Sequence, residues 1–536
     1  MAPPQEVGAR SAALGVRGAV TSSHPAVSQV GARVLADGGN AFDATLAMAA
    51  MSWMALPGQC GIGGDAFAVV REPDGRVWTL AGSGFGPDGG TAEVYRARGL
   101  TGLPLAGPLS VAVPGAAGVV VRLAGLASRE LADLWQPALT GARDGVPCTA
   151  KTRADIAGHV ALLAADQGAR EVFLPAGRIP SVGERVRQPA LAATLERLAR
   201  DPAAFHTGWF ADRAVASLAG AGAPFSGDEW RLGGDVPVEA ALATSYGGHV
   251  LHETPLPSAG WMVLHQALLL DGELRRTPQL GVEAVHWLAE SARASFRHRF
   301  ESVGADGTGW REALRPLAVT EVRRRIAAGQ PQEAPGIVPA GDTTSTVCID
   351  ADGTAVSFIH SLAYTFGSGV TVPDTGVLLN NRLGRGAYLI DGHPNEVRPR
   401  RKPMHTLNAW LLTDHDGLVA TGNCPGGDGQ VQWNMQVISH LVDHGDDPQR
   451  AVSLPRISVF PGSDADTLDA APVLRCEEGL DPAVLDGLEA RGHRVERLPV
   501  QRGGVGGSAL VVALDREHGV LVAAADPRMD GVALAV

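Results

Sequence analysis

The sequence predicts a layered α+β fold, and three observations support this prediction. Hydrophobic residues make up 45% of the 536 residues, which is enough for a large buried core. Residues 120–330 have mostly helical patterning, whereas 343–359 and 509–525 alternate with the period of two that is typical of strands. Further helical patterns, at 430–445 and 482–491, lie between these two strand regions. Such separation of helices and strands along a chain favours an α+β architecture.

Composition and charge argue against a nucleic-acid-binding, disulfide-rich, zinc-binding or membrane-spanning protein. The chain has 45 Lys+Arg against 57 Asp+Glu and a formal charge of −12, which argues against bulk nucleic-acid binding. Its five cysteines are scattered singly, unlike a disulfide framework or a zinc site. The first residues lack a secretory pattern, and the longest apolar stretch, 41–56, contains Asp43. We therefore expect a cytoplasmic protein with no nucleic-acid partner, membrane partner, metal or cofactor.

The N-terminal region contains two predicted helices followed by two predicted strands. Helical spacing covers 27–36, and Asn40 is a suitable N-cap for a second helix. Asp43 then falls in the first turn, where a carboxylate interacts favourably with the helix dipole. Residues 66–70 and 77–80 are apolar and are separated by turn residues, so we expect a strand at each.

The glycines between the second helix and the first strand, Gly61-Ile-Gly-Gly64, superficially resemble a phosphate loop. They lack the Lys-Ser/Thr pair of a P-loop. The predicted helix also precedes the glycines, whereas a phosphate site needs a helix that begins after them. We interpret this segment as a structural turn.

A segment rich in proline and glycine, 330–342, leads into a predicted β-hairpin that begins at Thr343. The hairpin would pair 343–349 with 355–359. If the chain were cut before Thr343, this threonine would carry a free α-amine beside its own Oγ. An α-amine has a pKa near ~8, so a sizeable fraction is neutral and can act as a general base. Threonine also favours strands without any catalytic role, and composition alone leaves both readings open.

A second candidate feature is the pair Gly426 and Gly427, which follows an extended segment at 417–423. Two adjacent glycines can turn two backbone N–H groups toward one point, as an oxyanion hole requires. Gly-Gly is also common in ordinary turns, so the pair carries little weight by itself.

Short motifs that are ordinary one by one occur over nearly the whole chain. Those in the first half are Gly18-Ala-Val-Thr-Ser-Ser-His-Pro25, Gly38-Gly-Asn-Ala-Phe-Asp-Ala44, Gly61-Ile-Gly-Gly64 and Val113-Pro-Gly115. Those in the second half are Gly341-Asp-Thr-Thr344, Phe366-Gly-Ser-Gly369, Gly376-Val-Leu-Leu-Asn-Asn381, Pro425-Gly-Gly427 and Ala525-Asp-Pro-Arg528. By their order and number, the chain resembles the gamma-glutamyltranspeptidase family of N-terminal nucleophile hydrolases.

The resemblance implies a four-layer αββα sandwich that forms a single composite domain and is made as a precursor. Thr343 Oγ would attack the carbonyl of Asp342, and an N-to-O acyl shift would give an ester that water hydrolyses. The products would be a large-subunit segment, 1–342, which ends in the tail 330–342, and a small-subunit segment, 343–536. The two segments would stay associated, with further pairing as a homodimer of heterodimers as one option.

In the processed protein, the resemblance implies that Thr343 attacks the substrate and forms an acyl-enzyme, with its own α-amine as base. Ser361 falls where the family usually has a threonine that supports the nucleophile. The backbone N–H groups of Gly426 and Gly427 would form the oxyanion hole. This chemistry needs no metal and no cofactor.

The residues with which gamma-glutamyl enzymes bind their substrate are mostly replaced. The family's carboxylate-binding arginine lies in an element that corresponds to 81–87, which contains no arginine. Arg382 and Arg385 stand where an acidic residue normally holds the substrate amine, and His405-Thr406 replace a Ser-Ser pair. The two arginines either pair with a substrate carboxylate or lie on solvent in a lid loop.

These replacements are similar to those of oxamate amidohydrolase-like and cephalosporin acylase-like members. Our main hypothesis is a self-processing hydrolase that cleaves an amide bond of a small anionic substrate through an acyl-enzyme. We assign Arg382, Arg385, His405 and Thr406 to the substrate-binding site. Three alternatives remain: a carbon–carbon hydrolase of antibiotic-type metabolism, a gamma-glutamyl hydrolase or transferase, and a non-catalytic binding protein that retains the fold.

Overall fold

Two antiparallel sheets form the centre of the molecule. The computed structural model describes residues 6–8, 10–329, 343–460, 472–500 and 507–536. Sheet I has seven strands in the order β19 (Val532–Ala535), β2 (Gly18–Ser22), β10 (Thr344–Asp350), β11 (Ala355–Ser361), β3 (Asp65–Arg71), β4 (Val77–Gly82) and β7 (Val238–Ala240). Sheet II also has seven, in the order β1 (Ala13–Gly15), β18 (Val520–Ala525), β17 (Leu510–Asp515), β13 (Gly417–Asn423), β12 (Trp410–Asp414), β9 (His249–Glu253) and β8 (Leu242–Tyr246).

Each sheet contains strands from both sides of the 342/343 junction. Sheet I takes β10, β11 and β19 from the second part of the chain, and its other four strands come from the first part. Sheet II takes β1, β8 and β9 from the first part. Neither 1–342 nor 343–536 contains all the strands of sheet I or of sheet II, so the chain folds as one composite unit.

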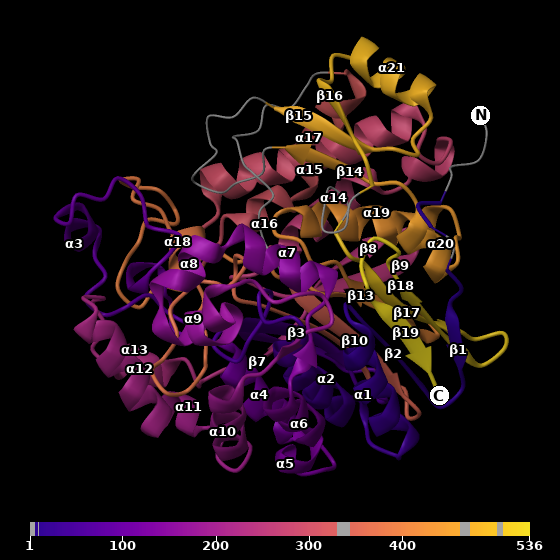
Figure 1. The fold of residues 1–536 in the computed structure, drawn as a ribbon. Coiled ribbons are helices and arrows are strands. Elements are labelled where there is room, and N and C mark those ends of the chain that lie inside the picture. Colours follow the sequence, from indigo (N-terminus) through magenta and orange to yellow (C-terminus); the bar gives the residue numbers. More distant parts are fainter. Residues whose placement is uncertain (1–5, 9, 330–342, 461–471, 501–506) are drawn as a thin grey trace.

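Helices cover the outer face of each sheet, so the layers follow the order αββα (Figure 1). The helices that pack on sheet I include α1 (Pro25–Ala36), α2 (Ala41–Ala55) and α4 (Ala116–Ala124). Those on sheet II include α14 (Gly260–Leu270), α15 (Val282–Ser302) and α19 (Gly429–Asp443). This arrangement confirms the predicted four-layer sandwich.

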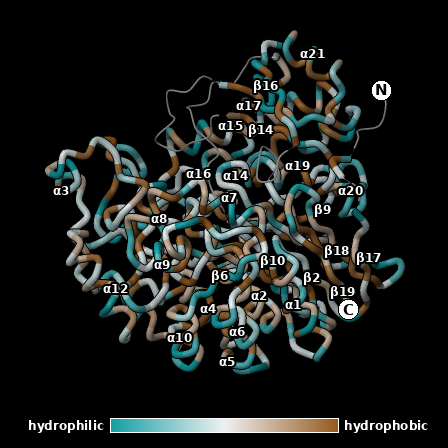
Figure 2. Tube along the Cα trace, in the orientation of Figure 1, coloured by the Kyte–Doolittle hydropathy of each residue, from teal (hydrophilic) through white to brown (hydrophobic). Residues whose placement is uncertain are grey.

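The hydrophobic core is divided among the spaces between these layers. One cluster joins sheet I to its helices, a second joins sheet II to its helices, and a third fills the space between the sheets. The third cluster includes Phe67, Val347, Leu411 and Val512. In Figure 2 the hydrophobic segments accordingly concentrate in the strands, and hydrophilic segments are frequent in the outer helices and loops.

The other elements surround the sandwich. The remaining helices are α3 (Ala92–Arg96), α5 (Leu131–Leu134), α6 (Gln136–Asp144), α7 (Ala150–Gly158), α8 (Val160–Ala165), α9 (Gln167–Phe173), α10 (Pro189–Leu198), α11 (Ala204–Thr207), α12 (Trp209–Gly220), α13 (Asp228–Leu232), α16 (Trp310–Ala313), α17 (Pro316–Ala327), α18 (Arg382–Gly386), α20 (Pro448–Ser453) and α21 (Pro482–Ala490). Single 3₁₀ turns are η1 (Pro108–Ser110), η2 (Pro175–Gly177) and η3 (Leu274–Arg276). Two small sheets consist of β5 (Val146–Pro147) with β6 (Arg185–Val186), and of β14 (Ile457–Phe460), β15 (Val473–Glu477) and β16 (Val495–Leu498).

Helix α2 begins as predicted, with a reciprocal cap. The Asn40 side chain accepts a hydrogen bond from the Asp43 N–H, and the Asp43 carboxylate accepts one from the Asn40 N–H, each at 2.9 Å. A third bond ties the helix to sheet I, because Asp350 Oδ2 accepts the Ala41 N–H at 2.9 Å. Every residue of α2 is buried, so this helix needs its terminal N–H groups satisfied within the protein.

Five strands inside 120–330 were not predicted: the two-residue strands β5 and β6, and the longer β7, β8 and β9. β7 and β8 are edge strands at the ends of sheets I and II, and β9 pairs with β8 as a hairpin. All residues of β7 are exposed, and β8 buries only Tyr246. Because an edge strand at the surface does not need an apolar face, these segments lack the alternation that marks a half-buried strand.

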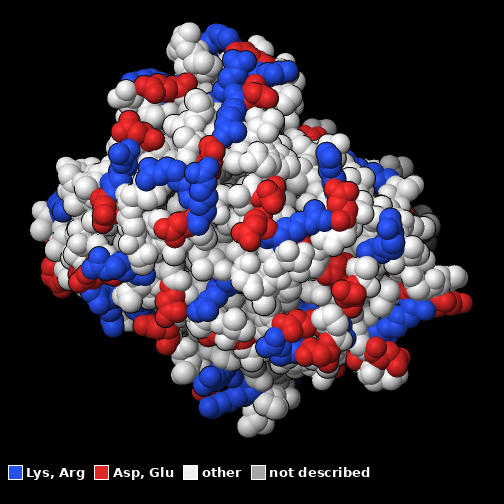
Figure 3. All heavy atoms as spheres, turned by 90° about the horizontal axis from the view of Figure 1, so that it is seen from below, with Lys and Arg blue, Asp and Glu red and all other residues white. Residues whose placement is uncertain are grey.

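The surface described by the structure carries charges of both signs. Figure 3 shows acidic and basic side chains interspersed over one face, without a continuous basic area there. Among the described residues, no helix is both long enough and apolar enough to span a bilayer.

Candidate active site

The candidate nucleophile Thr343 lies directly before β10, on the side of sheet I that faces sheet II. Thr344 pairs with His360 in the β10–β11 ladder, so Thr343 comes opposite Ser361. Thr343 Oγ1 donates a hydrogen bond to Ser361 Oγ at 3.4 Å, and Ser361 Oγ accepts the Ala363 N–H at 2.8 Å. Both hydroxyl residues are buried. This contact places Ser361 where it can orient the threonine hydroxyl, and the supporting role that the resemblance implies for it stays a prediction.

The expected cleavage junction falls partly outside the described residues. The description resumes at Thr343, and Asp342 and the rest of 330–342 precede it. The boundaries of the two expected segments therefore stay predictions.

Sequence reasoning missed Asp65, which lies beside Ser361 in the sheet. Asp65 is the register partner of Ser361 in the β3–β11 ladder and is completely buried. Its Oδ1 accepts the Gly115 N–H at 3.2 Å. Its Oδ2 accepts Arg382 Nε–H at 3.3 Å and His405 Nε2–H at 3.0 Å. A signal was present, because this acid directly follows the glycine motif at 61–64.

The glycine motif brings β3 close to the site. A Cβ atom added at Gly64 would lie 2.3 Å from the carbonyl oxygen of Ser361, a distance that only glycine allows. The motif is therefore a close approach of two backbones, in agreement with the structural turn expected for it.

Arg382 and Arg385 lie on the short helix α18, with only 1% and 4% of their surface exposed. Arg382 is paired with Asp65, as described above. Arg385 Nη1 donates to the Ala363 carbonyl at 3.2 Å, and its guanidinium carbon lies 4.6 Å from the centre of the Tyr364 ring. The alternative in which both arginines lie on solvent in a lid loop is therefore wrong.

His405 is buried between Asp65 and Phe67. Its Nδ1 accepts the Leu407 N–H at 3.3 Å, which leaves the proton on Nε2, where it is donated to Asp65. Burial, followed by the nearby Arg382 charge, lowers the pKa of His405 to about 3. The imidazole is thus neutral at ordinary pH and serves as a hydrogen-bond donor.

Thr406 is also buried, but the structure ties it to this cluster less firmly. Its carbonyl accepts Asn408 Nδ2–H at 3.0 Å. Its hydroxyl makes no hydrogen bond within the part of the chain that the structure describes. Of the four expected substrate-binding residues, Arg382 and His405 both donate hydrogen bonds to Asp65. Arg385 donates to the Ala363 carbonyl, two residues after Ser361. Thr406 is next to His405 in the chain, and no described contact joins its side chain to the other three.

The candidate oxyanion loop follows β13. Gly426 and Gly427 have φ values of 137° and 59°, and neither amide donates a hydrogen bond to another described residue. Gly426 packs on Trp433, because an added Cβ would lie 2.2 Å from its ring. The indole is fixed in turn by a 2.8 Å bond from Nε1 to Ser458 Oγ. The loop thus offers two unused N–H donors on a rigid support.

Hydrogen bonds between the sheets hold the end of β13 against β11. Ser357 Oγ donates to the Gly422 carbonyl at 2.9 Å, and Asn423 Nδ2 donates to Ser357 Oγ at 2.8 Å. Asn423 ends β13 just before the oxyanion loop, and Ser357 lies on the same strand as Ser361. They connect the sheet that carries Thr343 to the sheet that carries the glycine pair.

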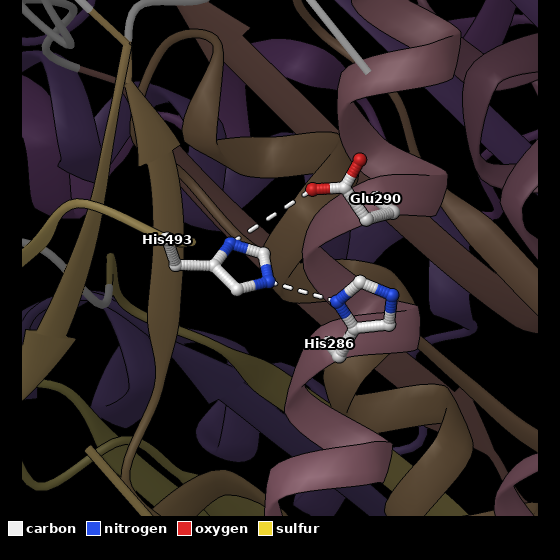
Figure 4. Close-up of side chains that lie close together, drawn as sticks. All are labelled: His286, Glu290 and His493. Carbon is white, nitrogen blue, oxygen red and sulfur yellow. Dashed lines mark hydrogen bonds and ion pairs between the residues drawn. The ribbon is translucent and has the colours of Figure 1, made fainter. Parts of the chain in front are cut away.

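Two groups of described side chains have the composition of a metal site, and in both of them side chains already bind an arginine. His286, Glu290 and His493 lie on α15 and before β16 (Figure 4). His286 Nδ1 lies 2.8 Å from His493 Nε2, and Arg293 Nη1 donates to His493 Nδ1 and to Glu290. A guanidinium inside the cluster opposes a second cation there.

The other group is the exposed run 414–416. Asp414 is held by Arg516 through two hydrogen bonds of 2.7 and 2.8 Å. Neither group includes Thr343 or its hydrogen-bond partner Ser361.

A threonine at the start of an inner strand, in a sandwich of two antiparallel sheets between helices, defines the class of N-terminal nucleophile hydrolases. The family model described as "Gamma-glutamyltranspeptidase" matches residues 27–536. This chain belongs to the gamma-glutamyltranspeptidase family, and it is an enzyme of the hydrolase type.

Similar proteins cover the whole chain. The glutathione hydrolase-like YwrD proenzyme of Bacillus subtilis (strain 168) is 31% identical, over 98% of this chain and 99% of its own. The oxamate amidohydrolase proenzyme of Klebsiella pneumoniae is 30% identical, with the same coverage of 98% and 99%. The crystal structure of cephalosporin acylase from Bacillus halodurans superposes with a TM-score of 0.89 at 28% identity, over 100% of this chain and 99% of its own. The predicted family and branch are confirmed.

Proposed function

We propose that this protein is a self-processing hydrolase that cleaves an amide bond of a small anionic substrate, with Thr343 as nucleophile. The observation that carries the proposal is the contact between Thr343 Oγ1 and Ser361 Oγ at the inner end of β10. The relatives support the self-processing part, since several are named as proenzymes. Two similar proteins, an oxamate amidohydrolase and a cephalosporin acylase, support amide chemistry.

Processing would begin when Thr343 Oγ attacks the carbonyl carbon of Asp342. The peptide C–N bond breaks as the ester C–O bond forms, and the proton lost by Oγ passes to the nitrogen, which becomes the α-amine of Thr343. Water then hydrolyses the ester, so 1–342 ends in a carboxylate and 343–536 begins with the threonine. The two segments would remain associated, because each sheet needs strands from both.

Turnover would use the same hydroxyl. The neutral α-amine accepts the Oγ proton as Oγ attacks the substrate carbonyl, and the N–H groups of Gly426 and Gly427 stabilise the oxyanion. The proton then passes to the leaving amine, and the acyl group stays on Thr343 as an ester. Water attacks this ester in a second round of the same steps and releases a carboxylic acid.

The charges near the nucleophile support an anionic substrate. Arg382 and Arg385 are both buried on α18, and Asp65 pairs with Arg382. Lys402 interacts with Glu239, Asp65 and Asp235, and burial lowers its pKa. A buried guanidinium binds a carboxylate through charge-assisted hydrogen bonds and repels the ammonium group of a gamma-glutamyl substrate.

A denaturing gel with intact-mass analysis tests the proposal. We expect wild-type protein to separate into two chains, 1–342 and 343–536, and the Thr343→Ala variant to remain one uncut chain without activity. Thr344→Ala is the matched control, because its side chain points to the helical layer, and it should still be cut. An uncut wild type that hydrolyses no amide in a panel of oxamate-like, acyl-amide and gamma-glutamyl compounds would contradict the proposal. Efficient transfer from glutathione would contradict the anionic part alone.

A further inference from the structure

The loop that carries Gly426 and Gly427 is attached to helix α15 by a buried ion pair. Asp428 directly follows Gly427, and its Oδ1 accepts a hydrogen bond from Arg299 Nη1 at 2.7 Å. The two side chains are 4% and 5% exposed. Arg299 lies in the last turn of α15, in the helical layer that covers sheet II. The loop is therefore held by a charged contact as well as by the packing of Gly426 on Trp433.

Asp428 stands at the N-cap of α19, where an aspartate usually accepts an N–H of its own helix. Its carboxylate makes no such capping hydrogen bond to the described part of that helix. It binds Arg299, which is 129 positions away in the chain. The carboxylate thus serves the contact with α15 rather than the start of its own helix.

The orientation of the Gly427 N–H follows from the first turn of α19. The Gly426 and Gly427 carbonyls accept the N–H groups of Gly429 and Gln430 at 3.1 and 3.2 Å. Within one trans peptide unit, the C=O and the N–H point in opposite directions. The Gly427 N–H shares a unit with the Gly426 carbonyl, so it points away from this turn. Asp428 lies between the two glycines and the two donors, so a fixed Asp428 side chain also fixes the turn.

Arg299 and Asp428 lie on opposite sides of the 342/343 junction. The candidate nucleophile Thr343 and both glycines belong to 343–536, whereas Arg299 belongs to 1–342. Through this ion pair, the first part of the chain contacts the loop of the second part directly.

We infer that Arg299 is a positioning residue that, through Asp428, keeps the N–H of Gly427 aimed at the oxyanion. Arg299 acts on the loop and not on the substrate, so its loss should change kcat more than KM. The effect on catalysis rests on the proposed function, whereas the fixing of the loop by Arg299 does not.

Steady-state kinetics of Arg299→Gln on an amide that the wild type cleaves tests the catalytic part. We expect kcat to fall by about tenfold to 10²-fold with KM little changed, because a displacement of about 1 Å can cost about 10²-fold in rate. Arg299→Lys keeps a cation for Asp428 and should recover most of the lost kcat.

Arg293→Gln is the matched control, because Arg293 lies on the same helix and also forms a buried ion pair, with Glu290. Both variants should unfold at lower urea concentrations than the wild type, but kcat should fall in Arg299→Gln alone. Equal losses of kcat in the two variants, or an unchanged kcat in a folded Arg299→Gln variant, would overturn the positioning role.

Hydrogen exchange at the amides of Gly429 and Gln430 tests the fixing of the loop without any turnover. These amides donate to the glycine carbonyls, so their exchange reports the opening of the turn. We expect exchange at least about tenfold faster in Arg299→Gln than in the wild type, and no change in Arg293→Gln. Unchanged exchange in Arg299→Gln overturns the inference, whether or not the wild type is cut and active.

A second variant keeps the test decisive if Arg299→Gln does not fold. The double variant Arg299→Met/Asp428→Asn removes both charges of the pair, and the same faster exchange and the same loss of kcat are expected. Exchange and kcat equal to those of the wild type in this variant would also overturn the inference.

Discussion

The nucleophile end of β10 and the neighbouring helix α18 are both buried, but different forces hold their side chains in place. Around Thr343 the contacts are hydrogen bonds between neutral groups, such as the hydroxyl of Ser361 and the backbone of Ala363. Around α18 they are contacts of buried ions, since Arg382 faces Asp65 and Arg385 stacks on an aromatic ring. In the proposed function, the first region contains the groups that perform the reaction, and the second contains charges that discriminate between substrates.

This difference shows how one scaffold keeps its chemistry and changes its specificity. A neutral hydroxyl pair and two backbone amides act on any carbonyl that reaches them. Buried charges act strongly on the charge of the ligand, because low polarity strengthens their interactions and an unmatched charge is costly. Under the proposed function, replacement of charged residues on α18 would therefore change the accepted substrates without a change in the nucleophile.

We expect the largest effect from substitution of Asp65, because this residue contacts both regions: it pairs with Ser361 in the sheet and with Arg382 on α18. Asp65→Asn removes the buried carboxylate that pairs with Arg382, so we expect a loss of about 3–5 kcal/mol in the free energy of unfolding. Urea unfolding measures this loss. In variants that remain folded, KM should change more than kcat, because Asp65 acts on the substrate-binding side chains.

The matched control is Asp88→Asn. Asp88 also pairs with an arginine, but its partner Arg400 is half exposed, so the loss should be at most about 1 kcal/mol. Equal losses for the two variants would show that Asp65 does not hold a buried ion pair.

We expect the next largest effect, a loss of kcat, from substitution of Gly426 in the oxyanion loop. Gly426→Ala would place a methyl group 2.2 Å from the ring of Trp433. The loop must therefore move, and its N–H groups would no longer point at the oxyanion. Loss of one oxyanion donor costs about 10²–10³ in kcat, which we expect here with KM little changed. Steady-state kinetics on a cleaved amide measures both constants.

Gly445→Ala is a suitable comparison for this variant. Gly445 also has a positive φ, of 67°, but an added Cβ would have no neighbour within 4 Å. Its substitution also places an alanine at a positive φ, but without the collision, so activity should persist. A similar loss of kcat in both variants would contradict the role of the Gly426 loop.

The features that the sequence predicted correctly are local. The β-hairpin that begins after Thr343 has a period of two and a turn within a few residues, and the cap of α2 spans only Asn40 to Asp43. Such patterns reflect neighbours in the chain, and physical rules for turns and caps describe them directly. The glycine pair at 426–427 was identified from a local pattern too, and its role as an oxyanion hole stays a prediction.

The features that the sequence could not reveal depend on distant parts of the chain. Asp65 and Arg382 are 317 positions apart, and only the sheet and α18 bring them together. The sequence showed Arg382 and Arg385 without their partners, which left open whether they pair with a substrate carboxylate or lie on solvent. Without the fold, no local pattern distinguishes a buried ion pair from a solvated one.

The pH dependence of the reaction gives the smallest effect and tests whether the two regions act independently. The pKa of His405 is about 3, mainly because of burial, so this histidine remains neutral from pH 5 to 8. The Thr343 α-amine must be neutral to accept the proton, so kcat/KM should fall as the pH drops through the pKa of that amine, near ~8 in unperturbed peptides. We expect one ionisation across this range in a pH–rate profile. His405→Gln should leave its midpoint unchanged, as should the exposed control His415→Gln. A second ionisation near pH 6 that disappears only in His405→Gln would show that a group of the binding region takes part in the proton transfer.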